Sequence, residues 1–196
     1  MNRPAALETI AWGYGLVEGP TVDDQDNLFF TDSLGSGVYK RTPDGEIETL
    51  MDDRPGTGGL CLHADGGFVV SGATVVHVKD GERRELLEVD GARINDFGTD
   101  AEGRIYAGSV RWNAWAGQSP TPGELWRINR DSPPEELYGD VLLANGVGFS
   151  PDGRRLYHCD FSSGTVILRS GGSSRRVSWT SSRSLAFMYW QTRQGL

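Results

Sequence analysis

Three polar residues, Glu18, Asn95 and Asn145, occupy one repeated position of the sequence. Each lies eight residues before the same point of a Gly- or Asp-containing turn. The aligned turn positions are Asp26, Gly66, Gly103 and Gly153, and Gly58 precedes the second of them at the same distance. Carboxylate and amide oxygens are ligands for hard divalent cations and hydrogen-bond partners for oxygen-rich substrates. The spacing therefore predicts that the three side chains form one metal or substrate site.

The segments that must position these residues form an internal repeat. Each unit is a short apolar run, a turn and a second apolar run, and the turns are 40, 37 and 50 residues apart. The units are Glu18–Asp32, Gly58–Gly72, Arg93–Ser109 and Ala144–Asp160. This period is typical of propeller blades, and runs rich in Val, Ile, Phe and Tyr with Asp-Gly turns favour β-hairpins. We therefore expect an all-β protein, a β-propeller with about four four-stranded blades present.

Further hairpins are expected outside the inner strands. Gly37–Arg41 with Glu46–Leu50, and Thr74–Lys79 with Arg83–Val89, fit the outer hairpins of the first two blades. Leu7–Gly15 reads as a lead-in segment or an edge strand. His77 falls on one of these outer hairpins, where we expect a surface histidine.

The third unit carries two further features. Arg93 precedes Asn95 by two residues, so in a strand both side chains point to one face. A buried arginine there would bind an anionic or oxygen-rich ligand, or else pair with Asp96 or Glu18. The insertion Val110–Pro122 places Trp112 and Trp115 either over a pocket or against a neighbouring blade.

Composition limits the partners and the compartment. The net charge of −8 argues against nucleic acid and anionic membranes, and no apolar run is long enough to span a bilayer. The N-terminus has no apolar core of a secretory signal, so a cytoplasmic location is expected. Cys61 and Cys159 lie in predicted strands without metal-ligand spacing, which favours reduced thiols, although a disulfide stays open.

The composition changes near the end of the chain. All 27 acidic residues lie in the first 160 positions, and residues 161–196 hold five arginines and nine serines. We therefore divide the chain into a partial propeller, residues 1–168, and a Ser/Arg-rich tail, residues 169–196. A shift of reading frame past Leu168 would explain the tail, and resequencing would test this hypothesis.

Four motifs, in order and with consistent register, resemble the SMP-30/gluconolactonase/LRE family of six-bladed propellers. They are Leu16–Pro20 (LVEGP), Arg93–Asp96 (RIND), Ala144–Phe149 (ANGVGF) and Ser150–Gly153 (SPDG). The resemblance covers roughly Trp12 to Arg169. It implies a divalent metal on the propeller axis, calcium or zinc in most members, with manganese or magnesium as further options. By position, Glu18 and Asn145 resemble the metal ligands, and Arg93 and Asn95 resemble the substrate-binding residues.

The resemblance implies a metal-dependent lactone hydrolase that opens a sugar lactone to an aldonic acid. In that family the remaining ligand, an aspartate that is also the proposed general base, lies about one blade after the equivalent of Asn145. Here that region contains no carboxylate. We therefore assign no catalytic residue and expect weak or no hydrolysis by the chain as written. Its oligomeric state is left open.

Two alternatives remain. The chain could be a non-catalytic β-propeller that binds a ligand or serves as a scaffold. Replacing Glu18 or Asn145 would then have no effect on lactone hydrolysis. It could also be a propeller of the strictosidine-synthase or paraoxonase type, which shares the architecture. The RIND and ANGVGF motifs favour the gluconolactonase family over these.

Overall fold

The computed structural model describes residues 7–113 and 116–178 as four antiparallel sheets of four strands each. In each sheet the strands follow one another in chain order from the innermost to the outermost. The first blade contains β1 (Val17–Val22), β2 (Leu28–Asp32), β3 (Gly37–Arg41) and β4 (Ile47–Met51). The second contains β5 (Leu60–Leu62), β6 (Phe68–Val70), β7 (Val75–Lys79) and β8 (Glu82–Leu87).

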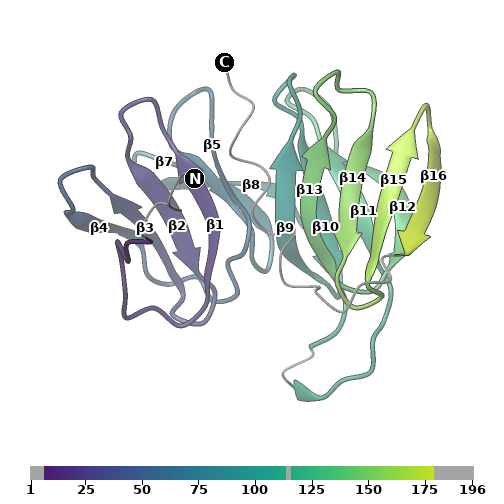
Figure 1. The fold of residues 1–196 in the computed structure, drawn as a ribbon, viewed down its shortest axis with the longest axis horizontal. Coiled ribbons are helices and arrows are strands. Elements are labelled where there is room, and N and C mark those ends of the chain that lie inside the picture. Colours follow the sequence, from purple (N-terminus) through teal and green to yellow (C-terminus); the bar gives the residue numbers. More distant parts are fainter. Residues whose placement is uncertain (1–6, 114–115, 179–196) are drawn as a thin grey trace, which may run out of the picture.

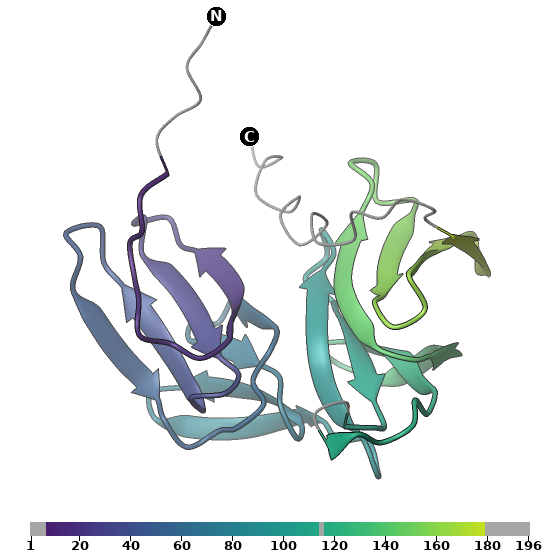
Figure 2. The ribbon, with the colours of Figure 1, turned by 60° about the horizontal axis from the view of Figure 1, so that its bottom comes forward.

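The third blade contains β9 (Arg93–Thr99), β10 (Ile105–Val110), β11 (Gly123–Ile128) and β12 (Glu135–Val141). The fourth contains β13 (Ala144–Phe149), β14 (Leu156–Asp160), β15 (Thr165–Ser170) and β16 (Ser173–Ser178). The blades follow one another along an arc, with the first and fourth blades at its two ends (Figures 1 and 2). The predicted all-β propeller with four four-stranded blades is confirmed.

The repeated turn has one backbone conformation in all four blades. The aligned positions have positive φ angles of 61° at Asp26, 92° at Gly66, 76° at Gly103 and 67° at Gly153. This left-handed conformation is easy only for Gly and, among other residues, for Asn and Asp. The sequence alignment of the four units therefore corresponds to a shared physical requirement.

Apolar side chains fill the spaces between successive blades. Phe29 and Val38 of the first blade pack with Leu60 and Val76 of the second, and the later blades repeat the arrangement. The blades approach closely near the axis because glycine is present there. A Cβ on Gly58 would lie 2.3 Å from the Asn95 carbonyl oxygen. Gly58 therefore lets the second and third blades meet.

The lead-in segment does not form the edge strand that was one of its two expected states. Its backbone is held by side chains: the Gly15 and Leu16 amides donate to the Asp32 carboxylate at 2.8 and 2.9 Å, and Arg41 Nε donates to the Ile10 carbonyl at 3.0 Å. Because these contacts replace a ladder of backbone hydrogen bonds, the segment crosses the outer face of the first blade without joining its sheet.

His77 is a second correction. It is only 8 % exposed, its ring stacks on His63 with centroids 3.9 Å apart, and Nε2 lies 2.8 Å from the Gly66 carbonyl oxygen. The surface position predicted for it was wrong, because the preceding turn folds over the outer hairpin.

The expected outer hairpins are present, and β16 extends the fourth blade to Ser178. The division at residue 168 and the shifted reading frame stay predictions, and residues 179–196 lie outside the described part of the chain. Both cysteines are free thiols. The described residues contain no helix of the length and hydrophobicity that a membrane crossing requires.

Candidate active site on the propeller axis

The three residues at the repeated position lie at matching places on the innermost strands. Glu18 is in β1, Asn95 in β9 and Asn145 in β13, and Gly58 directly precedes Gly59 and β5. A Cβ on Gly58 would contact both the Asn95 carbonyl oxygen, at 2.3 Å, and Glu18 Oε2, at 3.5 Å. The glycine therefore leaves room for the Glu18 carboxylate beside β9.

Each of the three strands is irregular at this point. The pairing of β1 with β2 shifts between Glu18 and Thr21, and that of β13 with β14 shifts between Asn145 and Val147. The pairing of β9 with β10 skips Asn95 and Asp96, which share a single opposite position. A β-bulge bends the strand and changes the direction of its side chains. The bulges therefore set the orientation of the candidate residues.

Asn95 connects the third and fourth blades. It is 7 % exposed, and its amide Nδ2 donates to the Ala144 carbonyl at 2.8 Å. Ala144 is the residue directly before Asn145, whose Oδ1 accepts the Gly146 amide at 3.0 Å. Asn95 therefore holds β13, and with it Asn145, against β9.

Asp96 is a site residue to which the sequence assigned no role except as a pairing partner of Arg93. Its carboxylate accepts the backbone amides of Phe97, at 2.8 Å, and of Gly146. Burial raises its pKa in spite of these two hydrogen bonds. The eight-residue spacing from the turn selects only Asn95. It does not select Asp96, because the spacing does not reveal that a bulge adds one residue to the strand here. The position of Asp96 directly after Asn95 was the only sequence signal that could have indicated it as a site residue.

Glu18 is the second carboxylate of the site with a raised pKa. Its pKa is raised to about 6, chiefly by burial and also by the charge of Asp96, while Arg93 and a hydrogen bond from Ser33 act in the opposite direction. Two carboxylates therefore lie close enough to repel each other, with one guanidinium near them. Arg93 forms no ion pair within 4.0 Å among the described residues, so neither structural pairing considered from the sequence is formed at that distance.

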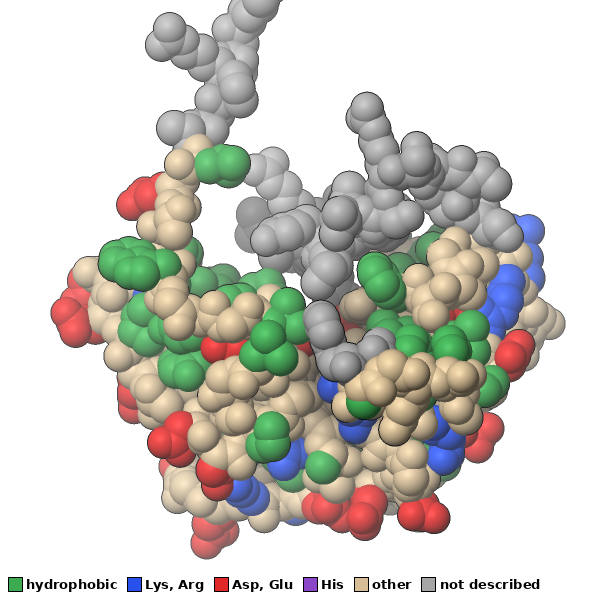
Figure 3. Space-filling view, turned by 90° about the horizontal axis from the view of Figure 1, so that it is seen from below, with side chains coloured by type: hydrophobic (Ala, Val, Ile, Leu, Met, Phe, Trp, Pro, Cys, Tyr) green, Lys and Arg blue, Asp and Glu red, His purple; other side chains and the backbone are tan. Residues whose placement is uncertain are grey.

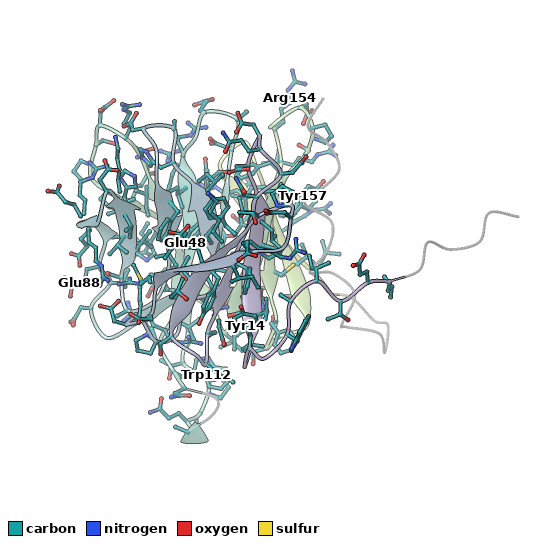
Figure 4. The ribbon with its side chains drawn as sticks, turned by 90° about the vertical axis from the view of Figure 1, so that its left-hand side faces the viewer. Tyr14, Glu48, Glu88, Trp112, Arg154 and Tyr157 are labelled. Carbon is teal, nitrogen blue, oxygen red and sulfur yellow. The ribbon has the colours of Figure 1, made fainter. Side chains whose placement is uncertain are left out.

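The insertion follows the end of β10, which pairs with the start of β9 at Arg93 and Ile94, so it begins at the end of the strands that carries the site. Trp112 of the insertion is labelled in Figure 4. Trp112 packs with Val110, Val141 and Ile167 between the third and fourth blades, and its Nε1 donates to the Leu142 carbonyl. The ring therefore packs on the neighbouring blade, one of the two predicted places. Trp115 lies outside the described residues.

A sequence profile of the family described as "SMP-30/Gluconolactonase/LRE-like region" matches residues 16–183. This match includes all four blades and every candidate site residue. The chain belongs to this family. Membership is in accord with the bulged inner strands that converge on the axis, and it confirms the resemblance inferred from the four motifs.

Individual relatives are similar over part of their length. The 6-deoxy-6-sulfogluconolactonase of Pseudomonas putida is 30 % identical over 142 residues, 68 % of this chain and 47 % of the relative. The chain spans about half the length of the curated relatives it matches. Among solved structures, a gluconolactonase from Xanthomonas campestris has a TM-score of 0.72 at 22 % identity, over 87 % of this chain and 64 % of that one.

A second solved structure is that of a calcium-binding protein, regucalcin, from Agrobacterium tumefaciens. It has a TM-score of 0.68 at 18 % identity and covers 82 % of this chain and 58 % of the other. At these identities the two structures support the fold and nothing finer.

Proposed function

We propose that this chain is a sugar-lactone hydrolase of the gluconolactonase type whose site takes a divalent metal ion. The observation that carries the proposal is the convergence of Glu18, Asp96, Asn95 and Asn145 with the Arg93 guanidinium on the propeller axis. A relative named for a sulfogluconolactone supports the substrate class.

The donor set fits a hard cation. Glu18 and Asn145 supply a carboxylate and an amide oxygen, the ligand types that calcium prefers and that zinc, manganese and magnesium accept. The Asp96 charge raises the pKa of Glu18, and a cation beside them would remove that repulsion. The described residues contain no group of three or more His, Cys, Asp and Glu side chains able to hold a metal. The proposed ligands therefore include the Asn145 amide.

Each residue of the proposed site would have a separate role. A bound divalent ion would polarise the lactone carbonyl and lower the pKa of a nearby water. The Arg93 guanidinium, with no ion pair among the described residues, would bind ring or hydroxyl oxygens of the sugar. Asn95 would hold β13 in place through Ala144 and offer its Oδ1 to a hydroxyl group. Asp96 would fix the backbone of Gly146 beside Asn145.

No residue is proposed as the general base. The sequence contains no Asp or Glu after Asp160, the region in which the family resemblance implies an aspartate base. We therefore expect hydrolysis by this chain to be weak, while metal binding through Glu18 and Asn145 is retained.

The test measures hydrolysis of glucono-1,5-lactone and the thermal midpoint of the purified chain, each with and without calcium, zinc or manganese. We expect a metal-dependent rise of the midpoint that Glu18→Gln and Asn145→Ala abolish. Asp152→Asn, in the exposed turn of the fourth blade, is the matched control and should keep the rise. Metal-dependent hydrolysis, however slow, would support the enzyme.

Two other outcomes decide against parts of the proposal. A metal effect without detectable hydrolysis would favour the non-catalytic ligand-binding propeller. A folded chain that responds to none of the three metals would refute the metal site.

A further inference from the structure

The fourth blade presents an apolar face of the kind that the first three blades bury. In each blade, three apolar residues on the second, third and fourth strands share one sheet face. The members on the third and fourth strands lie opposite each other, and the member on the second strand is the diagonal neighbour of the third-strand residue. These triplets are Phe29, Val38 and Met51; Val69, Val75 and Leu87; Tyr106, Leu125 and Tyr138; and Tyr157, Val166 and Val177.

The first three triplets pack against the next blade. Val38, Val75 and Leu125, the central members, are each 0 % exposed. In the fourth blade, however, Tyr157 is 37 % exposed and Val177 is 44 % exposed, and Val166 is only partly buried. The face of the fourth blade is thus built for contact with another blade and is open to solvent in the described part of the chain.

The first blade presents the matching face at the other end of the arc. Leu62 of the second blade and Phe149 of the fourth occupy the position of Val22, and both pack against the preceding blade. Val22 itself is 55 % exposed, and Ile47, on the same face, is 41 % exposed. Tyr14 of the lead-in covers the centre of this face by packing on Phe30 and Tyr39.

The exposed large apolar side chains gather at these two ends. Among the described residues they lie on the lead-in, the first blade and the fourth blade, and none lies on the second or third blade. The members are Leu7, Ile10, Trp12, Leu16, Val17, Val22, Leu34 and Ile47 at one end, and Tyr157, Phe161 and Val177 at the other.

The two ends also differ in charge. Asp24 and Glu46 are exposed beside the open face of the first blade, and the guanidinium of Arg41 on that face donates to the Ile10 and Thr42 carbonyls. Arg154, Arg155 and Arg175 are exposed on the fourth blade. Arg154 is labelled in Figure 4, and Figure 3 shows basic side chains at the edge of the molecule on the fourth-blade side. Contact between two copies of the fourth blade would bring arginines together, whereas contact between a fourth and a first blade brings opposite charges together.

We propose that a second copy of this chain docks its first blade on the open face of the fourth blade. The contact is heterologous: one copy presents Tyr157, Val166 and Val177, and the other presents Val22, Ile47 and the exposed ring of Trp12. This contact between two chains would resemble the packing between successive blades within one chain. Such a contact uses different surfaces on the two copies, so it can propagate. The proposal does not depend on the lactonase activity.

The test is the mass of the purified chain by light scattering after size exclusion, over a 100-fold range of concentration. We expect the mass to rise with concentration. Val177→Asp and Val22→Asp should each weaken association at least ~10-fold, because each places a charge in an apolar contact. Ala101→Asp, in an exposed turn of the third blade, adds the same charge and should leave association unchanged.

Mixing the two variants identifies the geometry. The Val177→Asp copy keeps an intact first blade and the Val22→Asp copy an intact fourth blade, so their mixture should form a dimer that does not grow further. If Val22→Asp alone associates like the unchanged chain, the heterologous contact is wrong. A chain that stays monomeric at every concentration would overturn the proposal and leave the face to a different polypeptide or to further blades.

Discussion

His158 should make the stability of this protein fall between pH 6.5 and pH 4. The ring is 0 % exposed between the third and fourth blades, and its Nδ1 lies 2.9 Å from the Tyr138 hydroxyl. Its Nε2 is buried without a hydrogen-bond partner among the described residues. Burial lowers its pKa from 6.5 to about 4, although Asp160 acts in the opposite direction.

The magnitude follows from the two pKa values. Between them the unfolded chain binds a proton at this histidine that the folded chain does not, so the free energy of unfolding falls as the pH falls. The gap between 6.5 and about 4 corresponds to about 3 kcal/mol, which is fully lost at the lower value. Above pH 6.5 the contribution of His158 should be constant.

The assay is urea unfolding followed by tryptophan fluorescence, at several pH values from 4 to 8, for the unchanged chain and for His158→Gln. The difference between the two free energies isolates His158, because other titrating groups are shared. It should change by about 3 kcal/mol over the range. A difference constant to within about 0.5 kcal/mol would refute the reasoning.

His63→Gln serves as the control for this experiment. The His63 side chain is 20 % exposed and its Nδ1 lies 4.0 Å from an Asp65 carboxylate oxygen. Burial lowers the pKa of His63 too, but the Asp65 charge acts against it. The pH-dependent difference for this variant should therefore be clearly smaller than that for His158→Gln.

Three further changes test the fold around the site. Gly58→Ala places a methyl group 2.3 Å from the Asn95 carbonyl oxygen and should cost about 3 kcal/mol in urea unfolding, whereas Gly146→Ala, with its nearest neighbour at 3.8 Å, should be tolerated. Asn95→Ala removes the bond to Ala144 and should cost about 1–2 kcal/mol; an unchanged midpoint would contradict its role in holding β13. Asp32→Asn should lower the thermal midpoint, because this carboxylate accepts four backbone amides, and hydrogen exchange at Gly15 and Leu16 should become faster.

The sequence by itself determined the repeat, the all-β class and the inner-strand positions of Glu18, Asn95 and Asn145. These follow from local chemistry: positive φ at the four aligned turns restricts the residue type there, and apolar runs of strand length must be buried. The four motifs and their order likewise indicated the family. Both kinds of information are local in the chain, so they can be read without knowing which segments meet.

The tertiary structure decided what depends on distance between segments. The bulge in β9 brings Asp96 into the site, and a bulge cannot be found by counting residues within one strand. The burial of His77 depends on the turn that folds over it, and that of His158 on the blade that packs against it. The open face of the fourth blade became visible only when Tyr157 and Val177 could be compared with their buried counterparts, because burial belongs to the packed blades and not to the residue type.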